Sequence, residues 1–238
     1  MKNKYRFPAE PTSECKEFLK KIHKKDKFYK MQAIIITPCL KNKICDTVNI
    51  GKDDFIICAD NSFPAAISQG IIPDLIIGDF DTGRSVSFPK EADILRFPVE
   101  KDDSDTMLCV KEAARRGFTK ITVAGGLSGR LDHTFANLQM LAYGAALGLD
   151  ITVTDGENEA FLLRPGKTAL PKKEGFSLSV FSYTEKTGGL SLSGVKYPLE
   201  NGELTNLFPL GLSNEITEEE AEISFTYGLL LVIISKLN

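Results

Sequence analysis

The sequence lacks several residues on which common functional classes depend. It has no tryptophan and only two histidines, which argues against a histidine-dependent catalytic triad. Its five cysteines form no C-x-x-C pair, and their odd number among hydrophobic neighbours favours reduced thiols in a cytoplasmic protein over a disulfide framework. Positive charge is not in excess either, because 29 basic residues face 32 acidic ones. A net charge of -3 makes nucleic acid a poor candidate partner.

Long apolar runs are missing as well. The longest, residues 228–234, is far shorter than the roughly 20 residues that cross a bilayer. The Lys-rich first 30 residues contain no apolar stretch typical of a signal peptide. We therefore expect no membrane segment. The composition is that of an ordinary globular protein, and 238 residues suffice for one large domain or two modest ones.

Apolar runs and helical patterns alternate between residues 32 and 154. Uninterrupted apolar strands that alternate with helices are typical of a parallel sheet covered on both faces. The sequence therefore predicts a Rossmann-like α/β domain, with Ser104 as the N-cap of one of its helices. The expected strands are residues 32–37, 54–59, 74–77, 93–97, 120–124 and 151–154, and the expected helices are residues 62–69, 104–116 and 132–147.

After about residue 164 the pattern changes to short β runs separated by Gly, Asn, Pro and Ser. Apolar residues alternate at period two between Ile223 and Ile233, which predicts antiparallel strands in a small sandwich or open barrel. We expect strands at residues 176–181, 189–192, 222–227 and 229–235. The predicted organisation is an extension with one short helix (1–30), an α/β domain (31–164) and a β domain (165–238). Met31 directly precedes the first strand and is a hypothetical native start.

Three acidic clusters each follow a predicted strand. They read Gly-Asp-Phe-Asp-Thr at 78–82, Lys-Asp-Asp-Ser-Asp at 101–105 and Gly-Arg-Leu-Asp-His at 129–133. Ligands of parallel sheets bind outside the carboxyl ends of the strands, so the three clusters can converge. Gathered carboxylates repel each other unless a cation joins them, and Mg²⁺ is a hard ion that takes oxygen ligands and usually arrives with phosphates. The clusters point to metal-assisted phosphoryl chemistry.

Each cluster also has a purely structural interpretation. Asp79 and Asp81 can belong to a solvated turn, and acidic residues at 102–105 suit the N-terminal end of the following helix. Three aspartates before one helix nevertheless exceed what capping requires. The glycine loop before Arg130 leads into a helix N-terminus, where backbone N–H groups and a guanidinium favour anions. A structural role and a ligand role both stay open for His133, which lies one helical turn before Asn137.

Two short runs only imitate nucleotide-binding motifs. Gly-Lys-Thr at 166–168 lacks the first glycine of a P-loop, and Pro171 follows it instead of a helix. The run at 124–129 misses the dinucleotide fingerprint by one glycine, which disfavours an NAD-linked oxidoreductase.

The three acidic clusters, the glycine loop and several further short segments resemble, in their order and spacing, the thiamine pyrophosphokinase (thiamin diphosphokinase) family. The resemblance runs from about residue 32 to the end of the chain and is far more specific than any single motif. One departure concerns the turn Asp60-Asn61-Ser62-Phe63, where the family usually has Asp-Gly-Gly-Ala. The matching segments are residues 59–60, 73–74, 77–82, 101–106, 126–138, 194–199 and 211–215.

The resemblance implies a homodimer whose subunits each combine an α/β nucleotide domain with a C-terminal β-sandwich. The family transfers the terminal pyrophosphate of ATP, with Mg²⁺, to the hydroxyethyl oxygen of thiamine and releases AMP. By similarity, the catalytic and metal-binding residues are Asp79, Asp81 and Asp105. The implied ATP-binding residues are Asp60, Lys101, Asp102, Gly126, Arg130, Asp132, His133 and Asn137, and the implied thiamine-binding residues are Ser213 and Asn214.

Two further expectations follow from the resemblance. Because tryptophan is absent, Phe208 is a candidate aromatic wall for thiamine. The altered turn after Asp60 leaves an alternative function open, a non-catalytic nucleotide- or thiamine-binding sensor on the same scaffold.

Overall fold

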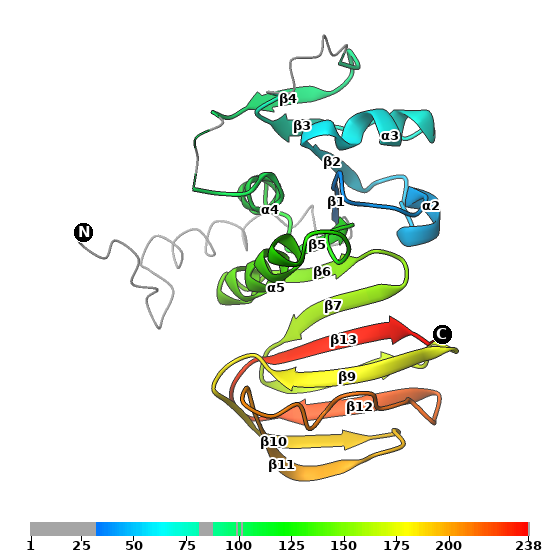
Figure 1. Ribbon diagram of the computed structural model, residues 1–238, viewed down its shortest axis with the longest axis vertical. Helices are drawn as coiled ribbons and strands as arrows, with labels where there is room; N and C mark the ends of the chain where they lie inside the picture. Colours follow the sequence, from blue (N-terminus) through cyan, green and yellow to red (C-terminus); the bar gives the residue numbers. More distant parts are fainter. Residues whose placement is uncertain (1–31, 81–87, 99, 101, 238) are drawn as a thin grey trace, which may run out of the picture.

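Two β-sheets and five helical segments make up the computed structural model, which describes residues 32–80, 88–98, 100 and 102–237 (Figure 1). The predicted N-terminal extension, its helix and the hypothetical start at Met31 lie outside the described residues. Within the described part of the chain, no helix is both long enough and apolar enough to cross a membrane.

The larger sheet has nine strands in the order β4-β3-β2-β1-β5-β6-β7-β13-β9. The first six in this order are parallel, and β7, β13 and β9 continue the sheet in antiparallel fashion. All six strands expected in the α/β region are confirmed. The bounds are β1 (Ala33–Ile36), β2 (Phe55–Ala59), β3 (Leu75–Gly78), β4 (Asp93–Arg96), β5 (Lys120–Ala124), β6 (Asp150–Thr154), β7 (Asn158–Leu163), β9 (Phe176–Ser182) and β13 (Leu230–Lys236).

Helices cover both faces of the parallel strands, as the continuous apolar runs predict. In β1, Ile35 packs in the core formed with α4 (Asp105–Arg115) and α5 (Leu131–Ala146), and Ile34 packs in the core formed with α2 (Ile44–Thr47) and α3 (Phe63–Ser68). A short 3-10 turn, η1 (Asp60–Ser62), precedes α3. Figure 1 shows α4 and α5 on one side of these strands and α2 and α3 on the other.

The smaller sheet is antiparallel, with strand order β11-β10-β12-β8. Its inner face packs on β9 and β13 through one apolar core that includes Leu190, Ile223, Leu230 and Val232. The two sheets form the β-sandwich expected for the C-terminal region. Its strands are β8 (Gly166–Pro171), β10 (Lys186–Ser193), β11 (Leu199–Thr205) and β12 (Glu220–Phe225).

The two predicted domains share a sheet. The chain passes from the larger sheet to the smaller between β7 and β8, close to the proposed boundary at residue 164. Yet β7 pairs with β6 on one side and with β13 on the other, so the parallel sheet continues into the sandwich. Both faces of β13 are therefore covered, and Leu230, Leu231 and Val232 are buried in succession where strict alternation was expected.

Candidate functional site

The ends of β2 and β3 meet at the carboxyl edge of the parallel sheet. A Cβ atom on Gly78 would lie 2.9 Å from the Cα of Asp60, so only glycine fits there without displacing the backbone. Asp60 itself has a positive φ of 44°, and its Oδ1 atom is shielded from solvent. Since Asp79 directly follows Gly78, two of the predicted site residues lie on touching strand ends.

The altered turn after Asp60 is accommodated without glycine. Asn61 and Ser62 both have negative φ, -77° and -79°, which any L-residue can adopt. The Ser62 hydroxyl donates a 2.8 Å hydrogen bond to the carbonyl of Ile36, and Phe63 is buried in the core with its ring 5.2 Å from that of Phe88. The departure from the family pattern thus attaches the turn to β1 and to the loop before β4.

The Asp-x-Asp loop contains an unusual backbone conformation. Phe80 has φ 54°, which for a bulky residue costs about 1–3 kcal/mol and persists only where surrounding contacts offset that cost. Its ring packs edge-on against Phe88, with centroids 5.0 Å apart, and the guanidinium carbon of Arg96 lies 5.0 Å from the ring centroid. Asp79 is half-buried beside this ring, whereas the predicted ligand Asp81 lies outside the described residues.

The aspartates before α4 point in different directions. Ser104 is the N-cap, as predicted, and its hydroxyl accepts a 3.2 Å hydrogen bond from the backbone N–H of Met107. Both oxygens of Asp103 accept hydrogen bonds of 2.7 Å from Lys111, so this carboxylate is turned along the helix. Asp102 is exposed, and Lys101 lies outside the described residues.

Asp105 is the first residue of α4, and its Oδ1 atom is shielded from solvent. Its negative charge affects a buried thiol one turn along the helix. Burial raises the pKa of Cys109 well above its usual value, and the charge of Asp105 raises it further.

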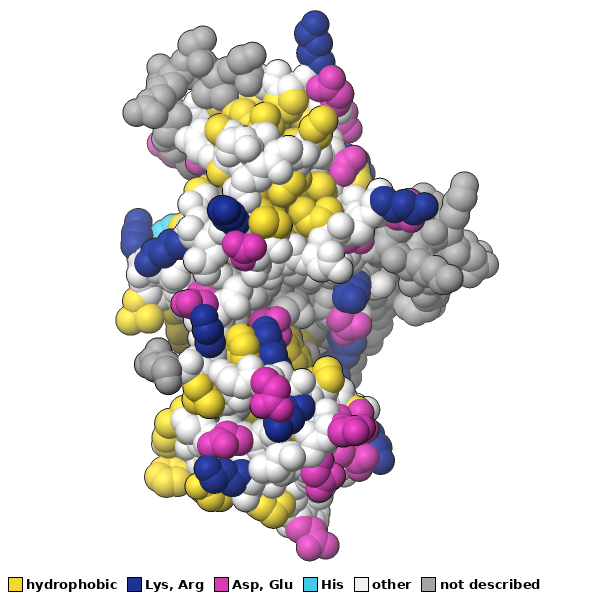
Figure 2. Space-filling view, turned by 90° about the vertical axis from the view of Figure 1, so that its right-hand side faces the viewer, with side chains coloured by type: hydrophobic (Ala, Val, Ile, Leu, Met, Phe, Trp, Pro, Cys, Tyr) yellow, Lys and Arg dark blue, Asp and Glu magenta, His cyan; other side chains and the backbone are white. Residues whose placement is uncertain are grey.

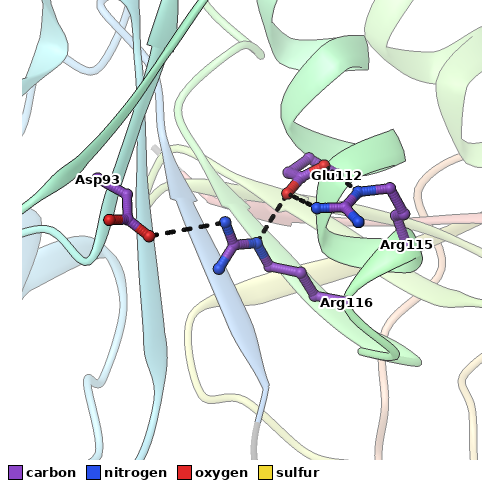
Figure 3. Close-up of polar contacts among 4 residues, drawn as sticks. All are labelled: Asp93, Glu112, Arg115 and Arg116. Atoms are coloured by element: carbon purple, nitrogen blue, oxygen red, sulfur yellow. Dashed lines mark hydrogen bonds and ion pairs between the residues drawn. The ribbon is translucent and has the colours of Figure 1, made fainter.

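The opposite end of α4 is fixed by a charged network (Figure 3). Glu112, which is buried, accepts hydrogen bonds from Arg115 at 2.6 and 2.7 Å and from Arg116 at 2.8 Å. The hydrogen bond from Arg115 lowers the pKa of Glu112, with a further contribution from Arg116 against the effect of burial. Arg116 also lies 3.9 Å from Asp93 and 5.1 Å above the ring of Phe55, which ties this end of the helix to β4 and β2.

The glycine loop after β5 packs tightly against neighbouring side chains. A Cβ atom on Gly125 would overlap the hydroxyl of Thr37, and one on Gly126 would overlap the amide of Asn137. Both glycines have positive φ, 100° and 90°. The buried Asn137 donates a 3.0 Å hydrogen bond to the carbonyl of Gly126. Its side chain therefore holds the loop in place.

Charged side chains at the start of α5 are exposed and paired with each other. Arg130 binds Asp132 through two contacts, of 2.6 and 3.1 Å, and the backbone N–H of His133 donates to the same carboxylate at 3.0 Å. The hydrogen bond from Arg130 lowers the pKa of Asp132, and the same contact raises the pKa of Arg130. Exposed pairs of this kind are weak, so Arg130 can turn toward a phosphate at little cost.

Carboxylate donors occur at this edge, but the described ones do not form a metal site by themselves. Asp60, Asp79 and Asp105 offer carboxylate oxygens, the ligands that Mg²⁺ prefers. Among the residues that the structure describes, no three His, Cys, Asp or Glu side chains form a group able to hold a metal. The described range omits Asp81, so the predicted three-residue set cannot be assembled from it.

The predicted thiamine residues lie in a segment that borders β9. Asn214 is buried, and its side chain makes three hydrogen bonds, to the backbone N–H and carbonyl of Tyr197 and to the N–H of Glu215, at 2.8 to 3.0 Å. Ser213 is exposed, with φ 58°, and its N–H donates to the hydroxyl of Ser179 at 3.0 Å. Asn214 thus fixes the segment, and of these two residues Ser213 is the one that presents its side chain to solvent.

A pocket of about 170 Å³ lies beside Asn214, and its wall includes Tyr197, Leu210 and Leu212. The side chains of these three wall residues are more than half exposed, as are those of Leu207 and Phe208 on the same segment. The sequence pattern gave no indication of this wall, because the segment has no regular periodicity. Phe208, the aromatic candidate named because tryptophan is absent, lines a second pocket instead.

The comparisons with known proteins agree on one family. Residues 48–153 match the description "Thiamin pyrophosphokinase, catalytic domain", and residues 167–230 match "Thiamin pyrophosphokinase, vitamin B1 binding domain". Thiamine pyrophosphokinase of Bacillus subtilis is 31% identical over 201 residues, which cover 82% of this chain and 94% of that protein. Thiamin pyrophosphokinase 1 of Caenorhabditis elegans is 26% identical over 68% of this chain and 70% of its own length.

Solved structures support the same assignment. The crystal structure of the B. subtilis enzyme superposes with a TM-score of 0.75 at 26% identity, covering 86% of this chain and 99% of that one. A thiamin pyrophosphokinase family protein from Enterococcus faecalis superposes with a TM-score of 0.74 at 27% identity, covering 87% of this chain and 100% of that one. The chain therefore belongs to the thiamine pyrophosphokinase family and is a thiamine diphosphokinase, as its motifs predicted.

Proposed function

We propose that the chain transfers the terminal diphosphate of ATP to the hydroxyl of thiamine, giving thiamine diphosphate and AMP, with Mg²⁺ as cofactor. The observation that carries this proposal is the contact between Gly78 and Asp60, which joins two acidic strand ends at the edge of the parallel sheet where nucleotides bind. The matches to a catalytic and to a vitamin B1 binding domain support the same reaction and disfavour a non-catalytic sensor.

Displacement at phosphorus depends mainly on positioning and on neutralising charge. Asp79, Asp81 and Asp105 would hold Mg²⁺, which when bound supplies positive charge to the polyphosphate oxygens. Arg130 and Lys101 would add charge from the protein, with Asp102, Asp132 and His133 nearby. The loop at Gly126 would present backbone N–H groups to the nucleotide, held there by Asn137. The acidic edge also attracts the thiazolium cation of thiamine, whose hydroxyl proton would pass to one of the aspartates.

Thiamine would bind beside Ser213 and Asn214, next to the pocket of about 170 Å³. Its positive ring suits an aromatic wall, for which the exposed Tyr197 and Phe208 are available. The apolar side chains of this segment also support the proposed homodimer, because a second copy would cover them. Light scattering coupled to gel filtration would measure the oligomeric state, and a monomer at micromolar concentration would refute the homodimer.

We place the enzyme in the cytoplasm, without a membrane or nucleic-acid partner. All four cysteines of the described residues are free thiols, which suits a reducing compartment. On the face shown in Figure 2, the basic and acidic side chains of the described residues are interspersed, so this face offers no extended basic surface to a polyanion.

The experiment that tests the reaction is an assay of the purified protein with ATP, Mg²⁺ and thiamine. We expect AMP to appear only when all three are present, together with thiamine diphosphate. A sensor would bind the ligands without forming AMP, and that outcome would overturn the proposal.

A further inference from the structure

Phe80 adopts a backbone conformation that is unfavourable for a bulky residue. Its φ of 54° lies in the left-handed region, where bulky side chains are rare, and it sits directly after Asp79. Such a conformation persists only where neighbouring contacts enforce it. Since Asp79 shares a peptide bond with Phe80, the contacts that hold the ring also restrict the backbone from which the Asp79 side chain projects.

The ring is held by an aromatic cluster that one arginine covers. Phe80 meets Phe88 edge-on, Phe88 stacks on the buried Phe63, and the guanidinium carbon of Arg96 lies 5.0 Å from the Phe80 centroid and 5.4 Å from that of Phe88. One cation thus spans two rings, a contact that attracts through the negative face of each ring. Phe63 belongs to the turn that departs from the family pattern, so the cluster joins that turn to the Asp79 loop.

Arg96 reaches this cluster because of strand register. It is the last residue of β4 and pairs with Gly78 of β3, while the N–H of Phe97 donates to the Gly78 carbonyl at 3.1 Å. In parallel strands, paired residues project to the same face, so the arginine side chain lies over a residue that has no side chain of its own. Among the described residues, no carboxylate forms an ion pair with Arg96 within 4.0 Å.

We propose that Arg96 is a positioning residue: its guanidinium clamps Phe80 against Phe88 and thereby directs Asp79 into the metal site. The inference rests on the proposed function, because it assigns Asp79 to Mg²⁺. Arg96 need not touch ATP in this role. A direct contact between Arg96 and a phosphate is the competing explanation, and the two differ in how the arginine couples to Phe80.

A double-mutant cycle separates these explanations. Arg96→Met removes the cation but keeps an apolar side chain of similar reach, and Phe80→Leu removes the aromatic face. The primary measurement is the affinity of the nucleotide-free enzyme for Mn²⁺, from the electron paramagnetic resonance signal of the free ion. KM for ATP and kcat are recorded at saturating Mg²⁺, and urea unfolding reports the stability of each variant.

If Arg96 acts through Phe80, Arg96→Met weakens Mn²⁺ binding about 5-fold, as expected for losing a contact worth about 1 kcal/mol. The same change in the Phe80→Leu background has little further effect, because the ring it would clamp is gone. If Arg96 binds phosphate, Mn²⁺ affinity is unchanged and KM for ATP rises by the same factor in both backgrounds. That result overturns the proposal.

Arg116→Met is the matched control, because Arg116 also lies over an aromatic ring. Its guanidinium carbon is 5.1 Å from the ring centroid of Phe55, the first residue of β2, whereas Asp79 follows the last residue of β3. We expect this variant to lower stability while leaving the Mn²⁺ affinity of the folded enzyme at the wild-type value. Equal losses of Mn²⁺ affinity in Arg116→Met and Arg96→Met would mean that lower stability alone weakens metal binding. That result would refute the proposal that Arg96 positions Asp79. A wild-type enzyme that binds no Mn²⁺ and makes no thiamine diphosphate would instead refute the proposed function itself.

Discussion

The side-chain amide of Asn137 donates a 3.0 Å hydrogen bond to the backbone carbonyl of Gly126, so helix α5 holds the glycine loop that precedes it. Gly126 cannot carry a side chain there, because its Cβ would overlap that same amide. Both residues were predicted to bind ATP. We propose that Asn137 serves the nucleotide by fixing this loop.

Replacing Asn137 with Ala should destabilise the protein by about 1–3 kcal/mol, because a buried hydrogen bond to the Gly126 carbonyl is lost. We also expect KM for ATP to rise more than kcat falls, since the loop loses its anchor before substrate binds. Urea unfolding and steady-state kinetics measure the two effects. The control is Gln139→Ala on the exposed face of the same helix. A variant with wild-type KM and normal stability would contradict this account of Asn137.

The close approach of Gly78 to Asp60 predicts that Gly78→Ala is harmful. The added Cβ would lie 2.9 Å from a backbone atom, so β2 or β3 must shift. Such overpacking costs about 1–3 kcal/mol, and the shift should reduce turnover because it moves Asp79. In the control, Gly51→Ala, the nearest atom is a carboxylate oxygen of Asp54 at 3.3 Å, which can move aside. Comparable losses in both variants would disprove a specific role for this contact.

The two aspartates on either side of Ser104 should respond differently to mutation. Asp105→Asn removes a predicted metal ligand, and we expect kcat to fall by about 100-fold or more without loss of the fold. Asp103→Asn should keep activity within about twofold, because its carboxylate is engaged with Lys111 along the helix. Thiamine diphosphate formation at saturating Mg²⁺ provides the comparison. Equal rates in the two variants would show that α4 does not present Asp105 to the site.

Acid should weaken the network around Glu112 (Figure 3). Its pKa is lowered below the ordinary 4.5, chiefly by the hydrogen bond from Arg115, so the folded state binds its proton less readily than the unfolded state. The charged form therefore stabilises the fold above pH 4.5, and this stabilisation is lost as pH falls through the lower folded pKa.

The variant Glu112→Gln tests this linkage. At pH 7 the variant should be less stable than the wild type by about 1 kcal/mol, a modest value because Arg115 is largely exposed. The difference should shrink as the pH falls below 4.5. Urea unfolding at a series of pH values measures it. A difference that grows toward acid would reverse the predicted sign.

Much of the fold was accessible from the sequence because buried strands and helices leave strong patterns. The runs at β1, β2 and β3 are apolar throughout, and Ser104 is followed by a clear helical periodicity. The strands that were missed are weakly patterned. In β11 only Leu204 is buried, and β7 has a single buried residue. The continuation of the parallel sheet through β7 into β13 joins residues about 70 positions apart, which no local pattern reports.

Candidate site residues were predicted where chemistry leaves a local signature, as in the acidic loops and the glycine loop. The partners of individual polar side chains were not foreseen. The Asp103 carboxylate contacts Lys111 along the helix that follows it, and the Asn137 and Asn214 side chains contact backbone groups of Gly126 and Tyr197. Arg96 was missed too, because only the register of β3 with β4 brings it to Phe80.

A transfer of the diphosphate group in one step can be told from two successive phosphate transfers by the balance of products. ATP labelled at its β-phosphate is incubated with the enzyme, Mg²⁺ and thiamine, and the nucleotide and thiamine products are separated and quantified. We expect AMP and thiamine diphosphate in equal amounts, with the label in the thiamine ester and no ADP. Formation of ADP with thiamine monophosphate, or no turnover that depends on thiamine, would contradict it.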